Sequence, residues 1–104
     1  MDPLEQLDSK IFSEQLNTDF TVSISGGNSL RLKLLEVSDK NSSPKIELFT
    51  LTFRGPTAPL LLQQTHSLEH EQLGKIEIFI TAVGVDEQGI LYEAVFHRFR
   101  KPNK

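Results

Sequence analysis

The chain contains no cysteine and no tryptophan among its 104 residues. Without cysteine it can form no disulfide, carries no thiol nucleophile and cannot build a cysteine-ligated zinc site. This absence fits a reducing compartment. The first residues hold neither a basic region nor an apolar run of signal-peptide length. We therefore expect a cytoplasmic protein that is open to later incorporation into a larger assembly.

Long apolar runs are also missing. No segment approaches the roughly 20 apolar residues of a membrane-spanning helix, so we expect no membrane partner. The hydrophobic fraction of 38% and the charged fraction of 24% are those of a folded globular protein. A length of 104 residues allows one domain, whose core needs no covalent cross-link.

Basic residues are concentrated at the C-terminus. The net charge is −3, and the last seven residues contain four of the positive charges, those of Arg98, Arg100, Lys101 and Lys104. Without these four the body has a net charge of −7, which disfavours binding to phosphate groups. We therefore expect no nucleic-acid partner, and we divide the chain into a single β domain, residues 1–97, and a basic tail, residues 98–104.

The hydrophobic period changes near residue 20. Apolar residues at three- to five-residue spacing predict a short helix within residues 3–16. From Phe20 onward apolar and polar residues alternate on both sides of Gly26-Gly27-Asn28, which predicts a β-hairpin over residues 20–36. The alternation slips by one residue at Leu34-Leu35 and again at Leu48-Phe49, so we expect bulges and a strongly bent sheet.

Residues 75–83 and 90–97 predict a second hairpin that is apolar on both faces. One face carries Phe79, Val83, Leu91 and Val95. We expect the N-terminal helix to cover this face, with a partner protein as the alternative. The pattern as a whole predicts a mainly β fold, a small antiparallel six-stranded barrel or sandwich with a short N-terminal helix.

The segment His66-Ser67-Leu68-Glu69-His70 matches the H-x-x-E-H pattern of inverted zinc peptidases. That chemistry needs a helix, because only a helix places histidines four residues apart on one metal ion. In a strand the two histidines lie roughly 13 Å apart. We favour surface or turn histidines. A metal-dependent hydrolase that uses His66, Glu69 and His70 is kept as the weaker alternative, and we assign no catalytic residue, no metal and no cofactor.

Two segments are candidate binding sites. Arg54 stands at a strand end before Gly55-Pro56, where an arginine can hold a carboxylate. We expect an internal glutamate from residues 69–77 as its partner, with a small ligand as the alternative. Pro59-Leu60-Leu61-Leu62 is either folded over an open barrel end or exposed as a binding patch, and we favour the folded arrangement.

Several motifs together resemble a known bacterial family, the domain of unknown function 6916. They are Leu51-Thr52-Phe53-Arg54-Gly55-Pro56, Gln64-Thr65-His66-Ser67-Leu68-Glu69-His70, Leu73-Gly74, Gly84-Val85-Asp86-Glu87-Gln88-Gly89 and Tyr92-Glu93-Ala94-Val95-Phe96. The resemblance covers roughly residues 8–97. His66 replaces an aromatic residue of the family pattern, and Gln64 replaces a glycine.

The resemblance implies a compact β domain with no established activity and no assigned catalytic residues. It also implies an accessory or assembly role beside phage-tail-like proteins. We therefore expect a non-enzymatic module whose partner is another protein or a second copy of itself. A small-ligand-binding domain that uses Arg54 is the second hypothesis.

Overall fold

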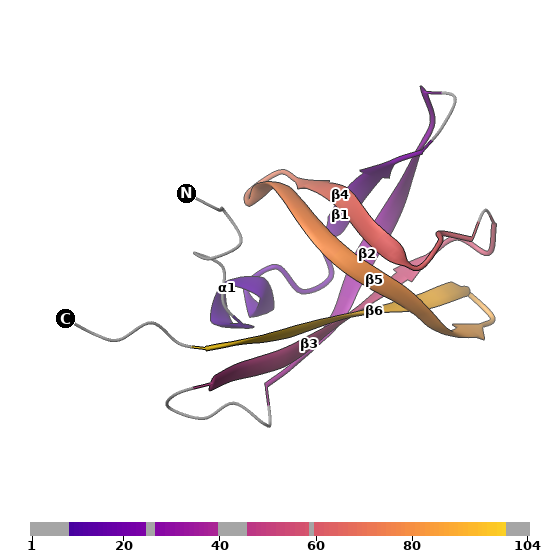
Figure 1. The fold of residues 1–104 in the computed structure, drawn as a ribbon. Helices are drawn as coiled ribbons and strands as arrows, with labels where there is room; N and C mark the ends of the chain where they lie inside the picture. The colour runs from indigo at the N-terminus through magenta and orange to yellow at the C-terminus, as the bar shows by residue number, and fades with distance from the viewer. Residues whose placement is uncertain (1–8, 25–26, 40–45, 59, 100–104) are drawn as a thin grey trace.

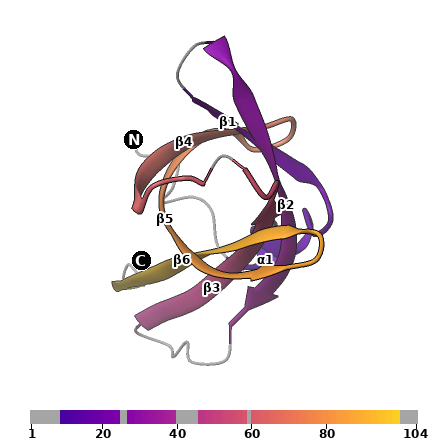
Figure 2. The same cartoon turned by 90° about the vertical axis from the view of Figure 1, so that its right-hand side faces the viewer.

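The computed structural model describes residues 9–24, 27–39, 46–58 and 60–99. In chain order the elements are α1 (Ser9–Ser13), β1 (Asp19–Ser23), β2 (Ser29–Ser38), β3 (Ile46–Gly55), β4 (Gln64–His70), β5 (Gly74–Asp86) and β6 (Gly89–Phe99). The strands form a closed antiparallel barrel in the order β1-β2-β3-β6-β5-β4 (Figures 1 and 2). The barrel is thus the correct one of the two predicted architectures.

Two ladders join the sequential meanders β1-β2-β3 and β4-β5-β6 into the barrel. The ladder between β3 and β6 is long and contains ten residue pairs, from Ile46↔Phe99 to Gly55↔Ile90. The ladder between β1 and β4 contains only two, Thr21↔Glu69 and Val22↔Leu68. The barrel is therefore strongly closed on one side and weakly closed on the other.

The predicted first hairpin is confirmed, with β1 and β2 paired from Asp19↔Lys33 to Ser23↔Ser29. The slip at Leu34-Leu35 is also confirmed, because the β2–β3 register shifts between Leu34 and Glu36. The bulge predicted at Leu48-Phe49 is wrong, since pairing with β6 continues through this point. Glu47 is buried at this point, so a charged residue takes one of the inward-facing positions of β3 and the alternation continues without a break.

The helix α1 closes one end of the barrel. Phe12 is fully buried, and its ring lies 6.0 Å from the ring of Phe49 and 5.6 Å from that of Phe96. In Figure 1, α1 sits in the opening between the pair β4–β5 and the pair β3–β6. The helix lies within the predicted residues 3–16, of which residues 3–8 are outside the described part of the chain.

The helix does not cover the outer face of the second hairpin, so that prediction is wrong. Phe79 is 52% exposed and Val95 is 58% exposed, both on this face. The reason is the position of Phe12, which directs the helix to the barrel interior. Among the described residues, none belongs to a helix with the length and apolar character needed to cross a membrane.

One contiguous core fills the barrel. Its members are Phe12, Phe20, Val22, Leu30, Leu32, Leu34, Phe49, Leu51, Phe53, Leu61, Leu68, Ile76, Ile78, Ile80, Ile90, Tyr92, Ala94 and Phe96. These residues come from α1, from all six strands and from the segment between β3 and β4. That last segment reaches the core through Leu61, at the end of the barrel opposite α1 (Figure 1).

Candidate functional site

The strongest candidate site is formed by residues 60–62, here called the leucine segment. Leu61 is buried, and its backbone N–H donates a hydrogen bond of 3.0 Å to the hydroxyl oxygen of Tyr92. Leu60 and Leu62 on either side of it are 58% and 68% exposed. The middle leucine is therefore folded in, as we favoured, whereas its two neighbours are exposed. Pro59 lies outside the described residues.

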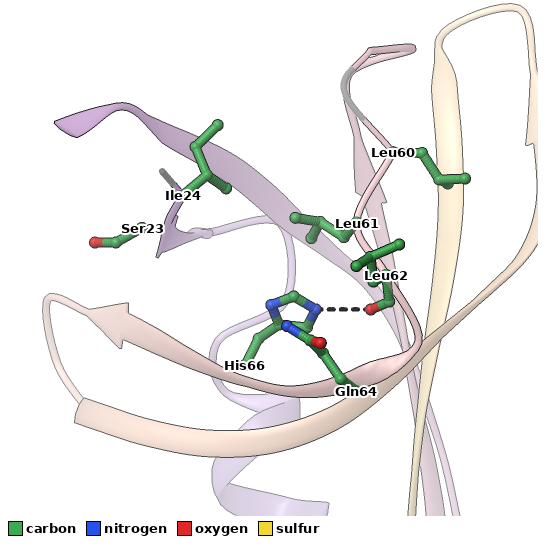
Figure 3. A pocket seen from close by; sticks show the side chains of 7 residues that line it. All are labelled: Ser23, Ile24, Leu60, Leu61, Leu62, Gln64 and His66. Carbon is green, nitrogen blue, oxygen red and sulfur yellow. Dashed lines mark hydrogen bonds between the residues drawn. The ribbon is translucent and has the colours of Figure 1, made fainter. Parts of the chain in front are cut away.

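A pocket of about 480 Å³ opens beside the leucine segment (Figure 3). Its walls come from the end of β1, from the leucine segment and from the start of β4. The lining residues are Ser23, Ile24, Leu60, Leu61, Leu62, Gln64 and His66. No described lining residue is an acid, a lysine or an arginine, so the pocket suits an apolar group better than a charged one.

His66 forms part of the pocket wall. Its Nε2 atom lies 2.8 Å from the carbonyl oxygen of Leu62 (Figure 3). A carbonyl oxygen only accepts hydrogen bonds, so Nε2 carries the proton and donates it. The imidazole thereby fixes the end of the leucine segment to β4.

The arrangement required for a zinc peptidase is not formed. Residues 64–70 are strand β4, so His66 and His70 lie near opposite ends of that strand, roughly 13 Å apart. Their ring nitrogens also have different partners, which are Leu62 for His66 and Thr18 for His70. Within the described part of the chain, no three histidine, aspartate or glutamate side chains are grouped to hold a metal ion.

His70 is a buried structural residue rather than a surface histidine. Thr18 Oγ1 donates its proton to the carbonyl oxygen of Gln15, so it must accept a proton from His70 Nε2, which lies 2.8 Å away. On the other side of the ring, Nδ1 accepts hydrogen bonds from the backbone N–H groups of Gln72 at 2.9 Å and Leu73 at 3.2 Å. The ring is therefore held in the neutral form with its proton on Nε2.

The environment of His70 agrees with this assignment. Burial lowers the pKa of His70 below the usual value of 6.5, and the negative charge of Glu71 opposes that effect more weakly. The ring also packs on Phe20, with 4.4 Å between the ring centroids. His70 thus connects the loop after α1 to the turn between β4 and β5.

Arg54 has an internal carboxylate partner, but the predicted glutamate of residues 69–77 is not that partner. The Nη2 atom of Arg54 donates to Asp86 Oδ2 at 2.5 Å. This hydrogen bond is the largest of the effects that lower the pKa of Asp86, followed by the hydrogen bond from the backbone N–H of Gln88. Asp86 also accepts from the N–H of Gly89, so one carboxylate orders the β5–β6 turn and pairs with β3.

A shallow hollow of about 390 Å³ lies beside Arg54 and includes Asp19, Arg31 and Lys33. Two acids, Asp19 and Asp86, accompany the three basic side chains here. The excess of positive charge is small, and the Nη2 atom of Arg54 is already bonded to Asp86, although its buried Nε atom has no hydrogen-bond partner among the described residues. This hollow is therefore a weaker candidate for a ligand site than the pocket beside the leucine segment.

Comparison with known proteins adds one match. A model of the family described as a domain of unknown function, number 6916, matches residues 7–96. No curated protein matches the chain, and no solved structure does either.

Proposed function

The chain belongs to the domain of unknown function 6916 family, and we propose that it is a non-enzymatic module that binds another protein through the leucine segment and its pocket. The observation that carries this proposal is the exposure of Leu60 and Leu62 beside a pocket whose described lining contains no acid, lysine or arginine. Leu61 anchors the segment to the core through its burial and its hydrogen bond to Tyr92.

The energetic argument concerns the two leucines that water still reaches. Full burial of a leucine side chain contributes roughly 1.5–3 kcal/mol. Leu60 is 58% exposed and Leu62 is 68% exposed, so a partner that covers both would gain a substantial part of this free energy from each leucine.

A second apolar surface is the competing candidate for the contact with a partner. The outer face of β5 and β6 carries Phe79, Val83 and Val95, each more than half exposed. Exposed apolar side chains that gather on one face commonly mark contacts with other proteins. Incorporation into a phage-tail-like particle is the finer form of this proposal, and it rests on the resemblance described above.

The two alternatives receive less support from the geometry. A small-ligand site at Arg54 would have to compete with Asp86, which already pairs with the guanidinium. A metal-dependent hydrolase that uses His66, Glu69 and His70 needs a helix where the chain has strand β4. Neither alternative is carried by an observation comparable with the exposed leucines.

The test is affinity purification of the tagged chain from an extract of its native cells, followed by mass spectrometry. The wild-type chain is compared with Leu62→Asp, which places a charge on an exposed position of the leucine segment. Val95→Asp is the matched control, because Val95 is comparably exposed but lies on the outer face of β6. We expect one stoichiometric protein that is retained by Val95→Asp and lost by Leu62→Asp.

Two results would contradict the proposal. One is a preparation in which no protein accompanies the wild-type chain. The other is a partner that Leu62→Asp retains and Val95→Asp loses, which would move the binding surface to the second hairpin. A partner containing tail or secretion components would support the finer form of the proposal.

A further inference from the structure

The weak closure of the barrel lies next to the leucine pocket. The β1–β4 ladder stops at Val22↔Leu68, although both strands continue beyond it in the same direction. In continued register Ser23 would face Ser67, yet these two described residues are not paired. On its other side β4 is paired with β5 along its whole length, from Gln64↔Ile80 to His70↔Gly74. We call the edge of β4 at residues 65–67, beyond its last pair with β1, the open seam.

The register shows which backbone groups point into the open seam. The N–H of Ile24 donates to the carbonyl oxygen of Asn28, so the backbone groups of Ile24 are directed toward β2. Backbone groups alternate in direction along an antiparallel strand, so those of Ser23 and Thr21 are directed toward β4. Thr21↔Glu69 is then the hydrogen-bonded pair of that ladder.

The same alternation applies along β4. If the backbone groups of Glu69 face β1, those of Ser67 and Thr65 face the open seam. The groups of Val22 point to β2, so the pair Val22↔Leu68 requires a hydrogen bond from the Ser23 N–H to the Ser67 carbonyl. The groups of β4 left without a strand partner, among the described residues, are the N–H and carbonyl of Thr65 and the N–H of Ser67. The hydroxyl oxygen of Ser67 is also buried without a hydrogen-bond partner among the described residues. Unpaired edges of this kind accept an added strand from another chain.

The side chains beside the open seam define what the added strand should carry. Ile24 and His66 line the pocket together with the leucine segment, and none of the described lining residues is an acid, a lysine or an arginine (Figure 3). Because side chains alternate across a strand, every second residue of an added strand would enter the pocket, and an unpaired charge there would be costly. Its remaining residues would face water.

We propose that the occupant is an extended segment of a partner protein, with uncharged apolar residues at alternate positions, which adds as a short strand to Thr65 and Ser67. Its inward side chains fill the pocket between Ile24 and Leu62. This inference rests on the proposed function and specifies how the partner is recognised. The binding mode is strand addition, in which main-chain hydrogen bonds give affinity and one pocket gives selectivity.

The first test is amide hydrogen exchange in the free protein, followed by NMR. The N–H groups of Thr65 and Ser67 should exchange rapidly, whereas those of His66 and Leu68, directed toward β5, should be protected. Peptides are then selected from a phage-displayed library of random 12-residue sequences, and the strongest is synthesised as the probe. Its binding should protect Thr65 and Ser67, and the selected sequences should alternate between apolar and polar residues.

Substitution at Thr65 separates the backbone from the side chain. Thr65→Pro removes the N–H that faces the open seam, and Thr65→Ala keeps it. We expect Thr65→Pro to weaken binding of the probe peptide at least tenfold and Thr65→Ala to change it by about twofold or less. If Thr65→Pro lowers the stability of the domain, the exchange data on the wild-type chain still decide the question.

The outcomes distinguish this inference from the proposed function. Probe binding that depends on Leu62 but leaves Thr65 and Ser67 unprotected would overturn strand addition while the proposed function stands. Selected peptides whose apolar residues recur at the three- to four-residue spacing of a helix would also overturn strand addition while the proposed function stands. Protection that rises with protein concentration and without peptide would identify a second copy as the occupant and overturn the choice of a partner segment. A library that yields no binder sensitive to Leu62→Asp would overturn both this inference and the proposed function on which it rests.

Discussion

His70 connects three parts of the fold, and two substitutions separate its contacts. Asparagine places an acceptor at the position of Nδ1 but cannot reach Thr18, whereas glutamine reaches Thr18 but offers no acceptor to the turn. His70→Gln leaves the backbone N–H groups of Gln72 and Leu73 without their shared acceptor. At about 0.5–1.5 kcal/mol for each net hydrogen bond, we expect a loss of about 1–3 kcal/mol in unfolding free energy.

His70→Asn is expected to cost more. It keeps the acceptor for the turn but removes the hydrogen bond to Thr18 and the ring packed against Phe20. Large-to-small changes at buried sites cost about 2–5 kcal/mol, and the smaller end applies here because asparagine fills part of the space. For a domain of this size each kcal/mol corresponds to about 4–8 °C in the melting temperature.

The pH dependence gives the sharper readout. Because burial lowers the pKa of His70 in the folded chain, the unfolded chain binds this proton more tightly. The stability contributed by His70 is therefore complete above pH 6.5 and is lost as the pH falls from 6.5 toward the lowered pKa. A proton on Nδ1 would also face the N–H groups of Gln72 and Leu73, so it must break both hydrogen bonds.

Urea unfolding at pH 7.5, 6.5 and 5.5 provides the measurement. One proton limits the loss through His70 to about 1.4 kcal/mol over this range, so we expect the wild-type chain to lose up to that amount and both variants to lack this component. Equal pH slopes in the wild type and in His70→Gln would refute the assignment of a neutral, doubly bonded imidazole. A wild-type chain that becomes more stable on acidification over this range would refute the sign of the argument.

Three further predictions concern stability by chemical unfolding. Gly89→Ala places a Cβ 1.9 Å from a backbone oxygen of β3, so we expect the unfolding free energy to fall by more than about 4 kcal/mol. Gly74→Ala, which has open space around the new Cβ but a φ of 78°, should lose only about 1–2 kcal/mol. Equal losses in the two variants would contradict the close approach of Gly89 to β3. Tyr92→Phe leaves the buried N–H of Leu61 unpaired and should cost about 1–3 kcal/mol, and an unchanged stability would show that this bond is dispensable. Phe12→Ala should cost about 3–5 kcal/mol, whereas a cost below 1 kcal/mol would mean that α1 is not part of the core.

The strands of this domain were predictable because their signals are local. The alternation from Phe20 to Leu34 and the glycines of the first turn indicated a hairpin, and the slip at Leu34 marked a bulge. The same reasoning failed at Leu48, because it assumed that an inward position must be apolar. Glu47 occupies that position instead, and only the pairing with β6 shows that the strand continues without a bulge.

The candidate site was only partly predictable. Three consecutive leucines identified the segment, but which of them reaches the core depends on Tyr92, more than 30 residues away in the chain. The role of His70 depends on Thr18, and the partner of Arg54 depends on how the β5–β6 turn meets β3. The open seam had no sequence signal, because it reflects how the first and fourth strands meet when the barrel closes.

The division of the barrel into two sequential meanders has a consequence for how the chain folds. Within each meander, neighbouring strands are also neighbours in sequence, so their pairing closes short loops at low entropic cost. Joining the meanders requires contacts between residues that are far apart, such as Gly55 with Ile90 and Ile46 with Phe99. We therefore expect folding to be limited by the docking of two preformed halves, with the two-pair ladder between β1 and β4 as the last contact made and the first to open.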